Sequence, residues 1–426
     1  MREIVIVIDS EFIWRSYFQS GLIQSLNKKY LVDILFVNVK PNDAPINVKY
    51  VKTNRIINFI TSVNSYAYWK ANSSKSQSFQ IRILSVLKRR RLFFSNNKDK
   101  SNLSISAIFG IILGSFKLRL PFFLNNTMNP KLLIYIKKND KKCFIYPTIG
   151  GPLSLSDFFT YKSIRNRIDS IICLENWDNI SSKAVFHLKP KKILVWGEQA
   201  AVSASFLHKI PVTNIYEAGS PRIEFTLSQL RYSNTSMKLK VLFAGGSQDY
   251  EQDLFWVHEV HKWLDEKFEL IYLPHPINYK FINSSINMKR LDSINVVNLE
   301  SNSVIVKDKQ LPKLDSYHKI MNDIFLIISP LSTMSLEALI YGKLSIGIDF
   351  FEEMYFQKRK KIWWATEVFE HYFGLEESPN FVLIKKPSDL LELELKSIKF
   401  VPEKIKDYFY NPVGFEKILE EAIQAV

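Results

Sequence analysis

Two short segments in the C-terminal half of the chain carry side chains suited to binding a negatively charged group. One is His275-Pro276, and the other is the hydroxyl pair Ser332-Thr333. An imidazole can donate a hydrogen bond to an anion. Hydroxyls that open a helix act together with the positive end of the helix dipole. The two segments therefore predict a pocket for a phosphate group, such as the phosphate of a nucleotide.

Each segment follows an apolar run with the composition of a buried strand. Residues 268–272 precede His275, and residues 324–328 precede Ser332. In an open α/β sheet, ligands bind beyond the carboxyl ends of the strands. We therefore expect the imidazole and the hydroxyls to converge around one anion at the same edge of a sheet.

Strand-like and helix-like segments alternate through the whole chain. A polar linker at residues 229–238 separates the two halves. The alternation predicts an α/β protein with two Rossmann-like, doubly wound domains that face each other across a cleft. We expect these domains at residues 1–230 and 239–426. We also expect a basic and apolar helical insertion at residues 63–125, and a strand at residues 132–136.

Composition limits the classes of function. The 426 residues are 46% hydrophobic and 14% aromatic, which excludes a disordered chain. Only two cysteines are present, which argues against a disulfide framework and for a reducing compartment. The formal net charge of +15 predicts an anionic partner, which leaves a basic nucleic-acid-binding protein as the non-enzyme alternative. Lys and Arg are scattered, however, and the sequence has no helix-turn-helix, RRM or zinc signature, so we expect no nucleic-acid partner.

A membrane-surface contact is predicted at residues 82–124. This stretch contains Lys88-Arg89-Arg90-Arg91 and then an apolar, glycine-containing segment. That segment is shorter than the roughly 18–20 residues that span a bilayer. A solvated helix end beside a buried helix is the alternative interpretation. The N-terminus lacks a secretory signal, so we expect a cytoplasmic protein that associates peripherally with the inner face of the plasma membrane.

Several motifs resemble one group of enzymes. His275-Pro276 resembles the HP motif of bacterial sialyltransferases, capsule Kdo transferases and CDP-glycerol glycerophosphotransferases. Residues 332–343 resemble their Ser-Ser/Thr element and the serine, Glu-Ala, Gly-Lys pattern of GT-B donor sites. Residues 177–183, 195–199 and 219–224 resemble elements that line the cleft of bacterial surface-polysaccharide transferases. The resemblance implies the two-Rossmann GT-B architecture and a glycosyltransferase of capsule or lipopolysaccharide biosynthesis.

The resemblance assigns donor-binding roles in the second domain. It implies that His275 and the hydroxyls contact the donor phosphate, and that a later glutamate, Glu337, holds the ribose. Glycines after an apolar run let the backbone approach a ligand, and Arg222 either binds phosphate or ties the domains together through Glu224. The predicted donor-binding residues are Gly245, Gly246, His275, Pro276, Ser332, Thr333, Glu337 and Arg222.

Acceptor activation requires a general base, and Asp178 is our first choice. It follows an apolar strand, although a turn in which Asp178 and Asn179 bond their own backbone is the alternative. Glu217 and Glu11 are rival bases. The predicted catalytic residues are Asp178, Glu217 and His275, and the predicted acceptor-binding residues are Glu11, Trp177, Asn179 and Lys183.

The predicted reaction is sugar transfer from a nucleotide-activated donor to a polysaccharide or lipid-linked acceptor. The chain lacks an Asp-x-Asp motif, so we predict a metal-independent reaction without a cofactor, in which a CMP- or CDP-linked sugar is the co-substrate. A CDP-glycerol-type polyol-phosphate transferase and a sugar-nucleotide epimerase on the same scaffold are the enzyme alternatives.

Overall fold

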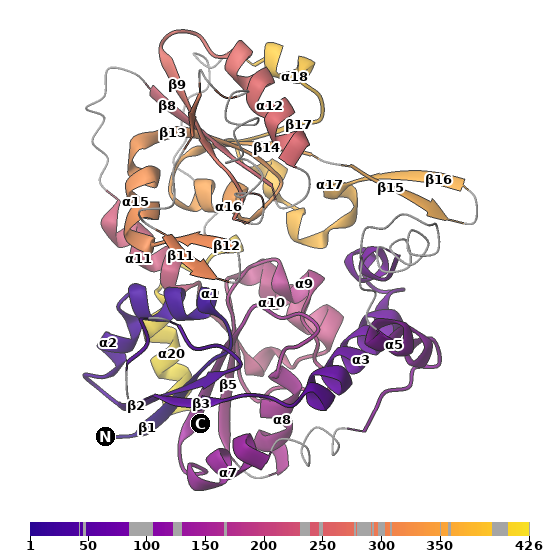
Figure 1. The fold of residues 1–426 in the computed structure, drawn as a ribbon, viewed down its shortest axis with the longest axis vertical. Coiled ribbons are helices and arrows are strands. Elements are labelled where there is room, and N and C mark those ends of the chain that lie inside the picture. The colour runs from indigo at the N-terminus through magenta and orange to yellow at the C-terminus, as the bar shows by residue number, and fades with distance from the viewer. Residues whose placement is uncertain are drawn as a thin grey trace.

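The structure is a computed structural model in which two parallel sheets, each flanked by helices, form two domains (Figure 1). It describes residues 1–41, 43–45, 48–84, 105–121, 130–165, 168–230, 239–246, 250–276, 278, 291, 294–296, 303–306, 309–349, 351–356, 359–393 and 408–425. The basic cluster at residues 88–91 lies outside these ranges.

The first domain is built on a parallel sheet in the order β3-β2-β1-β4-β5-β6-β7. Its strands are β1 (Glu3–Ile8), β2 (Leu31–Val37), β3 (Lys49–Val51), β4 (Cys143–Thr148), β5 (Asp169–Leu174), β6 (Ile193–Val195) and β7 (Ile215–Glu217). The central strands are continuous apolar runs because helices cover both faces of the sheet. Both cysteines, Cys143 and Cys173, are free and buried in β4 and β5.

Short helices cover this sheet. They are α1 (Glu11–Trp14), a π-helical turn at Arg15–Gln19, α2 (Leu22–Leu26), α7 (Pro130–Lys138), α8 (Ser156–Arg165), α9 (Asn179–Ser182) and α10 (Glu198–His208). Helix α11 (Pro221–Gln229) lies at the junction of the domains, where it packs against the π-helical turn and α15 (Leu314–Asp323). Our prediction of a strand at residues 132–136 is wrong, because these residues belong to α7. Leu132 and Ile136, four residues apart, are buried, while Ile134 is exposed. This is helical spacing, which a run of five apolar residues does not reveal.

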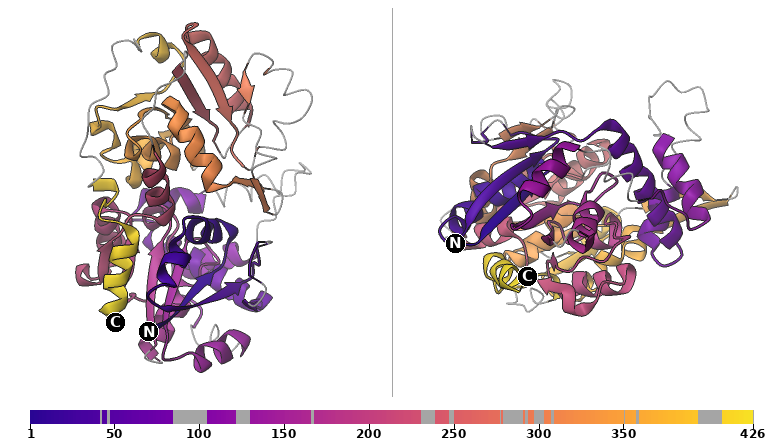
Figure 2. Two further views of the ribbon diagram at one scale, coloured as in Figure 1. Left: turned by 90° about the vertical axis from the view of Figure 1, so that its left-hand side faces the viewer. Right: turned by 90° about the horizontal axis from the view of Figure 1, so that it is seen from below.

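The structure describes part of the predicted helical insertion at residues 63–125. Helix α3 (Arg55–Asn72) and helix α5 (Ile105–Ser115) pack together, and residues 77–84 are also helical. Figures 1 and 2 show the α3–α5 pair at one side of the first domain, apart from the sheet. Among the described residues, no helix combines the length and the apolar composition needed to cross a membrane.

The second domain has a parallel sheet in the order β10-β9-β8-β13-β14-β17. Its strands are β8 (Leu239–Ala244), β9 (Phe268–Leu273), β10 (Asn295–Val296), β13 (Ile324–Pro330), β14 (Leu344–Ile348) and β17 (Phe381–Ile384). The helices are α12 (Tyr250–Trp263), α15 (Leu314–Asp323), α16 (Thr333–Ile340), α17 (Ala365–Val368) and α18 (Ser388–Leu391). Strand order reverses between β8 and β13, which creates a topological switch point.

Two hairpins and a C-terminal helix complete the described chain. The hairpins pair β11 (Ser303–Val306) with β12 (Lys309–Pro312), and β15 (Phe351–Phe356) with β16 (Arg359–Trp364). Helix α20 (Phe415–Gln424) returns to the first domain, where Phe415 and Leu419 pack in the same cluster as Ile6. We expected residues 239–426 to form the second domain, but α20 lies on the first.

Candidate functional site

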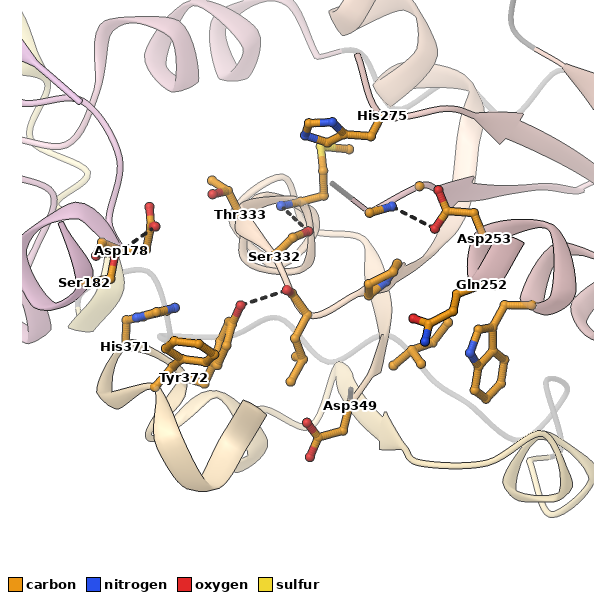
Figure 3. A pocket seen from close by; sticks show the side chains of 18 of the residues that line it. Asp178, Ser182, Gln252, Asp253, His275, Ser332, Thr333, Asp349, His371 and Tyr372 are labelled. Atoms are coloured by element: carbon orange, nitrogen blue, oxygen red, sulfur yellow. Dashed lines mark hydrogen bonds between the residues drawn. The ribbon is translucent and has the colours of Figure 1, made fainter. Parts of the chain in front are cut away.

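A cleft of about 690 Å³ lies between the two domains (Figure 3). One wall comes from the carboxyl ends of the strands of the second sheet, and the other comes from the segment that follows β5. The wall of the second domain includes the residues after all five neighbouring strands β9, β8, β13, β14 and β17. This is the edge at which doubly wound sheets bind ligands.

The loop after β8 runs close to the start of the loop after β9. A Cβ atom added at Gly245 would lie 2.5 Å from Asp253 Oδ2 and 3.1 Å from the His275 backbone nitrogen. Asp253 is buried, and its carboxylate accepts hydrogen bonds from the Gly246 N–H (3.0 Å) and the Tyr272 hydroxyl (3.3 Å). The absence of a side chain at Gly245 therefore lets this fixed carboxylate hold the loop against His275.

Ser332 and Thr333 stand where β13 leads into α16. Ser332 is the N-cap of this helix, and its Oγ accepts a hydrogen bond from the Met334 N–H at 3.2 Å. The Tyr372 hydroxyl donates to the Leu331 carbonyl at 2.7 Å and holds the preceding residue in place. His275, Ser332 and Thr333 all line the cleft. An anion there would meet the positive end of the α16 dipole.

Asp178 faces these residues from the wall of the first domain. Its Oδ2 accepts hydrogen bonds from Lys183 Nζ at 2.9 Å and from the Ser182 hydroxyl at 3.3 Å. Its Oδ1 has no hydrogen-bond partner among the described residues. Burial raises the pKa of Asp178, but Lys183, His371 and the hydrogen bonds to the carboxylate lower it more. The net effect is a pKa below the ordinary value, so the group is ionised.

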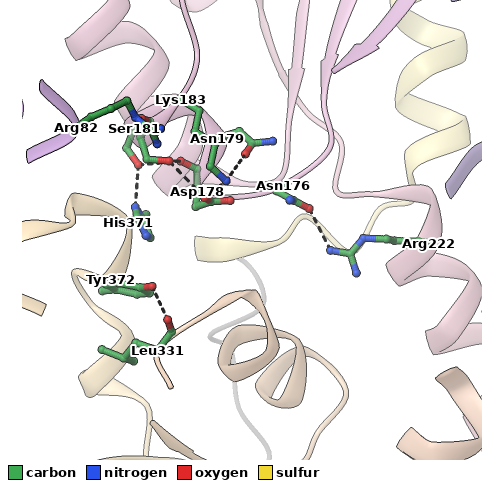
Figure 4. A network of polar contacts seen from close by, with 11 residues as sticks. Arg82, Asn176, Asp178, Asn179, Ser181, Lys183, Arg222, Leu331, His371 and Tyr372 are labelled. Carbon is green, nitrogen blue, oxygen red and sulfur yellow. Dashed lines mark hydrogen bonds and ion pairs between the residues drawn. The ribbon is translucent and has the colours of Figure 1, made fainter. Parts of the chain in front are cut away.

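His371 ties the two walls together (Figure 4). Its Nδ1 is hydrogen-bonded to the Ser181 hydroxyl of the first domain at 3.1 Å. Its ring packs edge-on against Trp177, with 5.1 Å between the ring centroids. Burial lowers the pKa of His371 to about 4, with Lys183 and Arg82 lowering it further and Asp178 opposing the shift. The imidazole is therefore neutral at neutral pH.

Comparison with known proteins adds information on the fold. No family model matches this chain, and no curated protein matches it in sequence. Solved structures do match. A UDP-GlcNAc 2-epimerase from Methanocaldococcus jannaschii is 11% identical, with a TM-score of 0.53 over 98% of this chain and 99% of that chain. The chain has a GT-B-like fold.

Two further structures agree. The M. jannaschii UDP-GlcNAc 2-epimerase in complex with UDP-GlcNAc and UDP is 13% identical, with a TM-score of 0.50 over 98% of this chain and 99% of that chain. A UDP-N-acetylglucosamine 2-epimerase is 10% identical, with a TM-score of 0.50 over 100% of this chain and 95% of that chain. At such identities the likeness is one of fold. It confirms the predicted fold class of two Rossmann-like domains.

In this GT-B-like arrangement, Arg222 and Glu337, which we predicted to bind the donor, lie away from the cleft lining. Arg222 Nη1 and Glu337 Oε1 form a buried ion pair at 2.5 Å. The Tyr317 hydroxyl donates to Glu337 Oε2 at 2.5 Å, and Arg222 Nη2 reaches Asn176 Oδ1 at 3.3 Å. Arg222 thus ties the two halves together, through Glu337 rather than through Glu224.

The pKa values reflect this pairing. Burial lowers the pKa of Arg222, but Glu337, Tyr341 and Tyr317 together raise it more, and the net shift is upward. Glu337, which we expected to hold the ribose, instead has its carboxylate occupied by an arginine and a tyrosine.

The other predicted residues divide between the cleft and its surroundings. Trp177 and Lys183 line the cleft, but Trp177 is buried against His371, Tyr372 and Phe409 rather than presented for stacking. Four more predicted residues are absent from the lining: Pro276, Asn179, which is fully buried in α9, Glu11 in α1, and Glu217 at the end of β7.

Sequence reasoning missed several residues of the cleft. Asp349 follows β14, and Lys385 and Lys386 follow β17, so the strand-end rule would have found them. Arg82 reaches the cleft from the helical insertion, where its Nε donates to the Ser182 carbonyl at 2.7 Å. No local sequence signal marks Arg82 or His371, because their positions depend on long-range packing.

The acidic side chains of the cleft are engaged with the protein. Asp178 is paired with Lys183, and Asp349 accepts hydrogen bonds from the Ala365 N–H (2.9 Å) and the Thr366 hydroxyl (2.6 Å). Within the described residues, no group of three or more His, Cys, Asp or Glu side chains is arranged to hold a metal ion. Metal independence stays a prediction.

Proposed function

We propose that this protein is a glycosyltransferase that transfers a sugar from a nucleotide-activated donor to a hydroxyl acceptor in the interdomain cleft. One observation carries the proposal. His275, Ser332 and Thr333 stand at the strand ends of the second sheet, and they face the ionised Asp178 of the first domain across one cleft. An anion site and a carboxylate base on opposite walls are the parts that such a transfer needs.

The donor lies against the second domain in this proposal. Its phosphates sit at the N-terminus of α16, where the Ser332 and Thr333 hydroxyls and His275 provide hydrogen-bond donors. Lys385 and Lys386 line the same wall and add positive charge. The solved relatives of this fold include one with UDP-GlcNAc and UDP bound, which makes uridine nucleotides candidates beside CMP- and CDP-linked sugars.

Asp178 acts as the general base. The acceptor oxygen forms a bond to the anomeric carbon while the bond from that carbon to the donor phosphate breaks. The acceptor proton passes to Asp178, and the nucleotide leaves with the electron pair of the broken bond. Oδ1 is the oxygen that takes the proton, because Oδ2 is already held by Lys183 and Ser182. Oδ1 is itself buried, so the acceptor reaches it only when the side chains that cover it shift. The anion site stabilises the charge that develops on the leaving phosphate.

The acceptor is a polysaccharide or a lipid-linked glycan in this proposal. Its support is Arg82, a cation from the helical insertion that lines the cleft beside Asp178. A basic side chain at this position suits an acceptor that carries phosphate or carboxylate groups.

Product analysis tests the proposal. The protein is incubated with CMP-, CDP-, UDP- and GDP-linked sugars and with CDP-glycerol, with and without a bacterial glycan extract, in buffer that contains EDTA. We expect free nucleotide to appear only with acceptor and to be lost in Asp178→Asn. An epimerase would isomerise the donor without acceptor, and a polyol-phosphate transferase would release CMP while moving phosphate. Either product pattern contradicts sugar transfer, and full dependence on an added divalent ion contradicts the metal-independent route.

A further inference from the structure

The helical insertion carries an apolar stripe that has no partner within the described chain. Ile105, Phe109, Ile112 and Phe116 are 76%, 42%, 51% and 72% exposed, and they recur at steps of four, three and four residues. This spacing places them along one side of helix α5 and its last turn. Leu118 extends the exposed apolar surface. Contiguous apolar surface of this kind marks an interaction site.

The opposite side of α5 is already used. Gly110 and Gly114 let the helix approach α3 so closely that an added Cβ would lie 2.4 Å from the Val63 carbonyl oxygen and 2.5 Å from the Ala67 carbonyl oxygen. Ser106 and Ala107 are buried on this side as well. Packing within the first domain therefore explains the glycine face of α5, and it leaves the stripe unexplained.

The charge of the chain is concentrated in the same region. Residues 44–139 contain 17 Lys and Arg against a single acidic residue, Asp99, whereas the rest of the chain contains 40 Lys and Arg and 41 Asp and Glu. The described parts of this region, residues 44–45, 48–84, 105–121 and 130–139, contain eleven Lys and Arg and no Asp or Glu. Lys75 and Lys117 are exposed cations close to α3 and α5.

We propose that the α3–α5 insertion docks on the surface of an anionic lipid bilayer. A helix with an outward apolar stripe and basic surroundings binds a membrane interface in two ways. The apolar side chains are buried among the lipids, and the basic side chains are attracted to anionic headgroups. A second copy of this chain fits the stripe less well, because two regions of such strong positive charge repel each other. A nucleic acid would leave the isoleucines of the stripe in contact with water.

The docked insertion stands next to the cleft. Arg82 belongs to the helical segment that follows α3, and it lines the cleft with its Nε bonded to the Ser182 carbonyl. Docking through α5 would hold the cleft beside the lipid surface. The docking proposal itself does not depend on the reaction, so failure of the glycosyltransferase proposal leaves it standing.

Vesicle sedimentation of the full chain tests the proposal. One set of vesicles contains phosphatidylglycerol and phosphatidylcholine in equal parts, and the other contains phosphatidylcholine alone. We expect binding to the anionic vesicles that weakens as NaCl rises from about 0.1 M to about 0.5 M. The triple variant Phe109→Ser, Ile112→Ser, Phe116→Ser and the double variant Lys75→Glu, Lys117→Glu should each lose at least about tenfold in affinity.

Matched variants control for general effects. Val202→Ser with Phe206→Ser removes exposed apolar side chains from α10, and Lys28→Glu with Lys267→Glu makes the same charge change elsewhere. Both should bind as the parent does. All changed residues are exposed, so the melting temperatures should stay close to that of the parent. Equal binding by the insertion variants and the parent overturns the proposal. The proposal is also overturned if the parent protein does not bind anionic vesicles, whether it instead binds an oligonucleotide or dimerises through the stripe.

Discussion

Arg222 Nη1 and Glu337 Oε1 lie 2.5 Å apart, and both side chains are almost fully buried. Arg222 belongs to α11, and Glu337 belongs to α16, the helix whose N-terminus opens into the cleft. The pair therefore fixes the helix that carries Ser332 and Thr333 relative to the first half of the chain. A glutamate that appeared suited to a ribose is instead part of the frame that positions the anion site.

Removing one partner of this pair should strongly destabilise the fold. Glu337→Gln leaves the buried Arg222 without its counter-charge, and we expect a loss of about 3–5 kcal/mol in the free energy of unfolding. Glu259→Gln removes the partner of the exposed Lys262 and should cost less than about 1 kcal/mol. Denaturant titration compares the two variants, and equal effects would show that burial of the Arg222–Glu337 pair is unimportant.

The two neighbouring glycines of the β8 loop should respond differently to alanine. At Gly245 a methyl group meets Asp253 Oδ2 at 2.5 Å, and this carboxylate is held by two hydrogen bonds. At Gly246 its shortest contact is with the Pro330 ring, at 3.1 Å, and Asp253 Oδ1 lies at an ordinary contact distance of 3.6 Å. We expect Gly245→Ala to cost about 1–3 kcal/mol and Gly246→Ala less, as measured by denaturant titration. The reverse order would contradict the packing described for this loop.

The acid limb of the pH–rate profile should depend on Lys183. Asp178 must be ionised to accept a proton, so kcat/KM should fall as the pH falls through the pKa of Asp178. Lys183 helps to hold that pKa below the ordinary value, against the opposing effect of burial. In Lys183→Met the pKa of Asp178 should rise, and the acid limb of kcat/KM should move to higher pH.

Two controls sharpen this test. Lys191→Met changes an exposed lysine and should leave the limb in place. Asp178→Asn should lower the rate by about 10²- to 10⁴-fold while donor binding is retained. If the acid limb of Lys183→Met lies at the same pH as that of the parent, Asp178 is not the group whose ionisation determines this limb.

Glu175 should make stability depend on pH. Burial raises the pKa of Glu175 to about 7, while the nearby Tyr17 and the Ser16 hydroxyl, which donates to Glu175 Oε2 at 3.0 Å, lower it. Between its ordinary value of 4.5 and about 7, the folded state holds a proton that the unfolded state has released, so stability falls as pH rises. Over this window the parent should lose about 3 kcal/mol more than Glu175→Gln, which cannot ionise.

Unfolding free energies at pH 4.5 and pH 7 measure this difference. Glu376→Gln, a change to an exposed carboxyl, should follow the parent across the window. Curves for Glu175→Gln that run parallel to the parent would show that Glu175 titrates normally in the folded protein.

Much of the fold follows from local patterns in the sequence. Continuous apolar runs such as Ile4–Ile8 predict buried parallel strands, and the residues that follow such runs include His275, Ser332 and Asp178, all of which line the cleft. Five apolar residues at 132–136 were too few to separate strand from helix. The strand-end rule also applies to Asp349 and Lys385, although we did not extend it to them.

The remaining features depend on contacts between distant residues. His371 contacts Ser181, which lies 190 positions earlier in the sequence, and no local periodicity predicts such a contact. We predicted that Arg222 and Glu337 each contact the nucleotide donor, which requires both side chains to face the cleft. Whether two opposite charges meet one another or a ligand is decided by tertiary packing, which spacing along the chain does not encode.

The most direct test of the central claim is nucleotide-dependent thermal stabilisation of the parent, His275→Ala and Ser332→Ala. A ligand at about a hundred times its Kd stabilises the folded state by about 2.7 kcal/mol, which raises the melting temperature. We predict that at least one of CMP, CDP, UDP or GDP stabilises the parent and the control variant His261→Ala, and that both cleft variants lose this ligand-dependent shift. Full stabilisation of His275→Ala and Ser332→Ala by the same nucleotide would contradict an anion site at these residues.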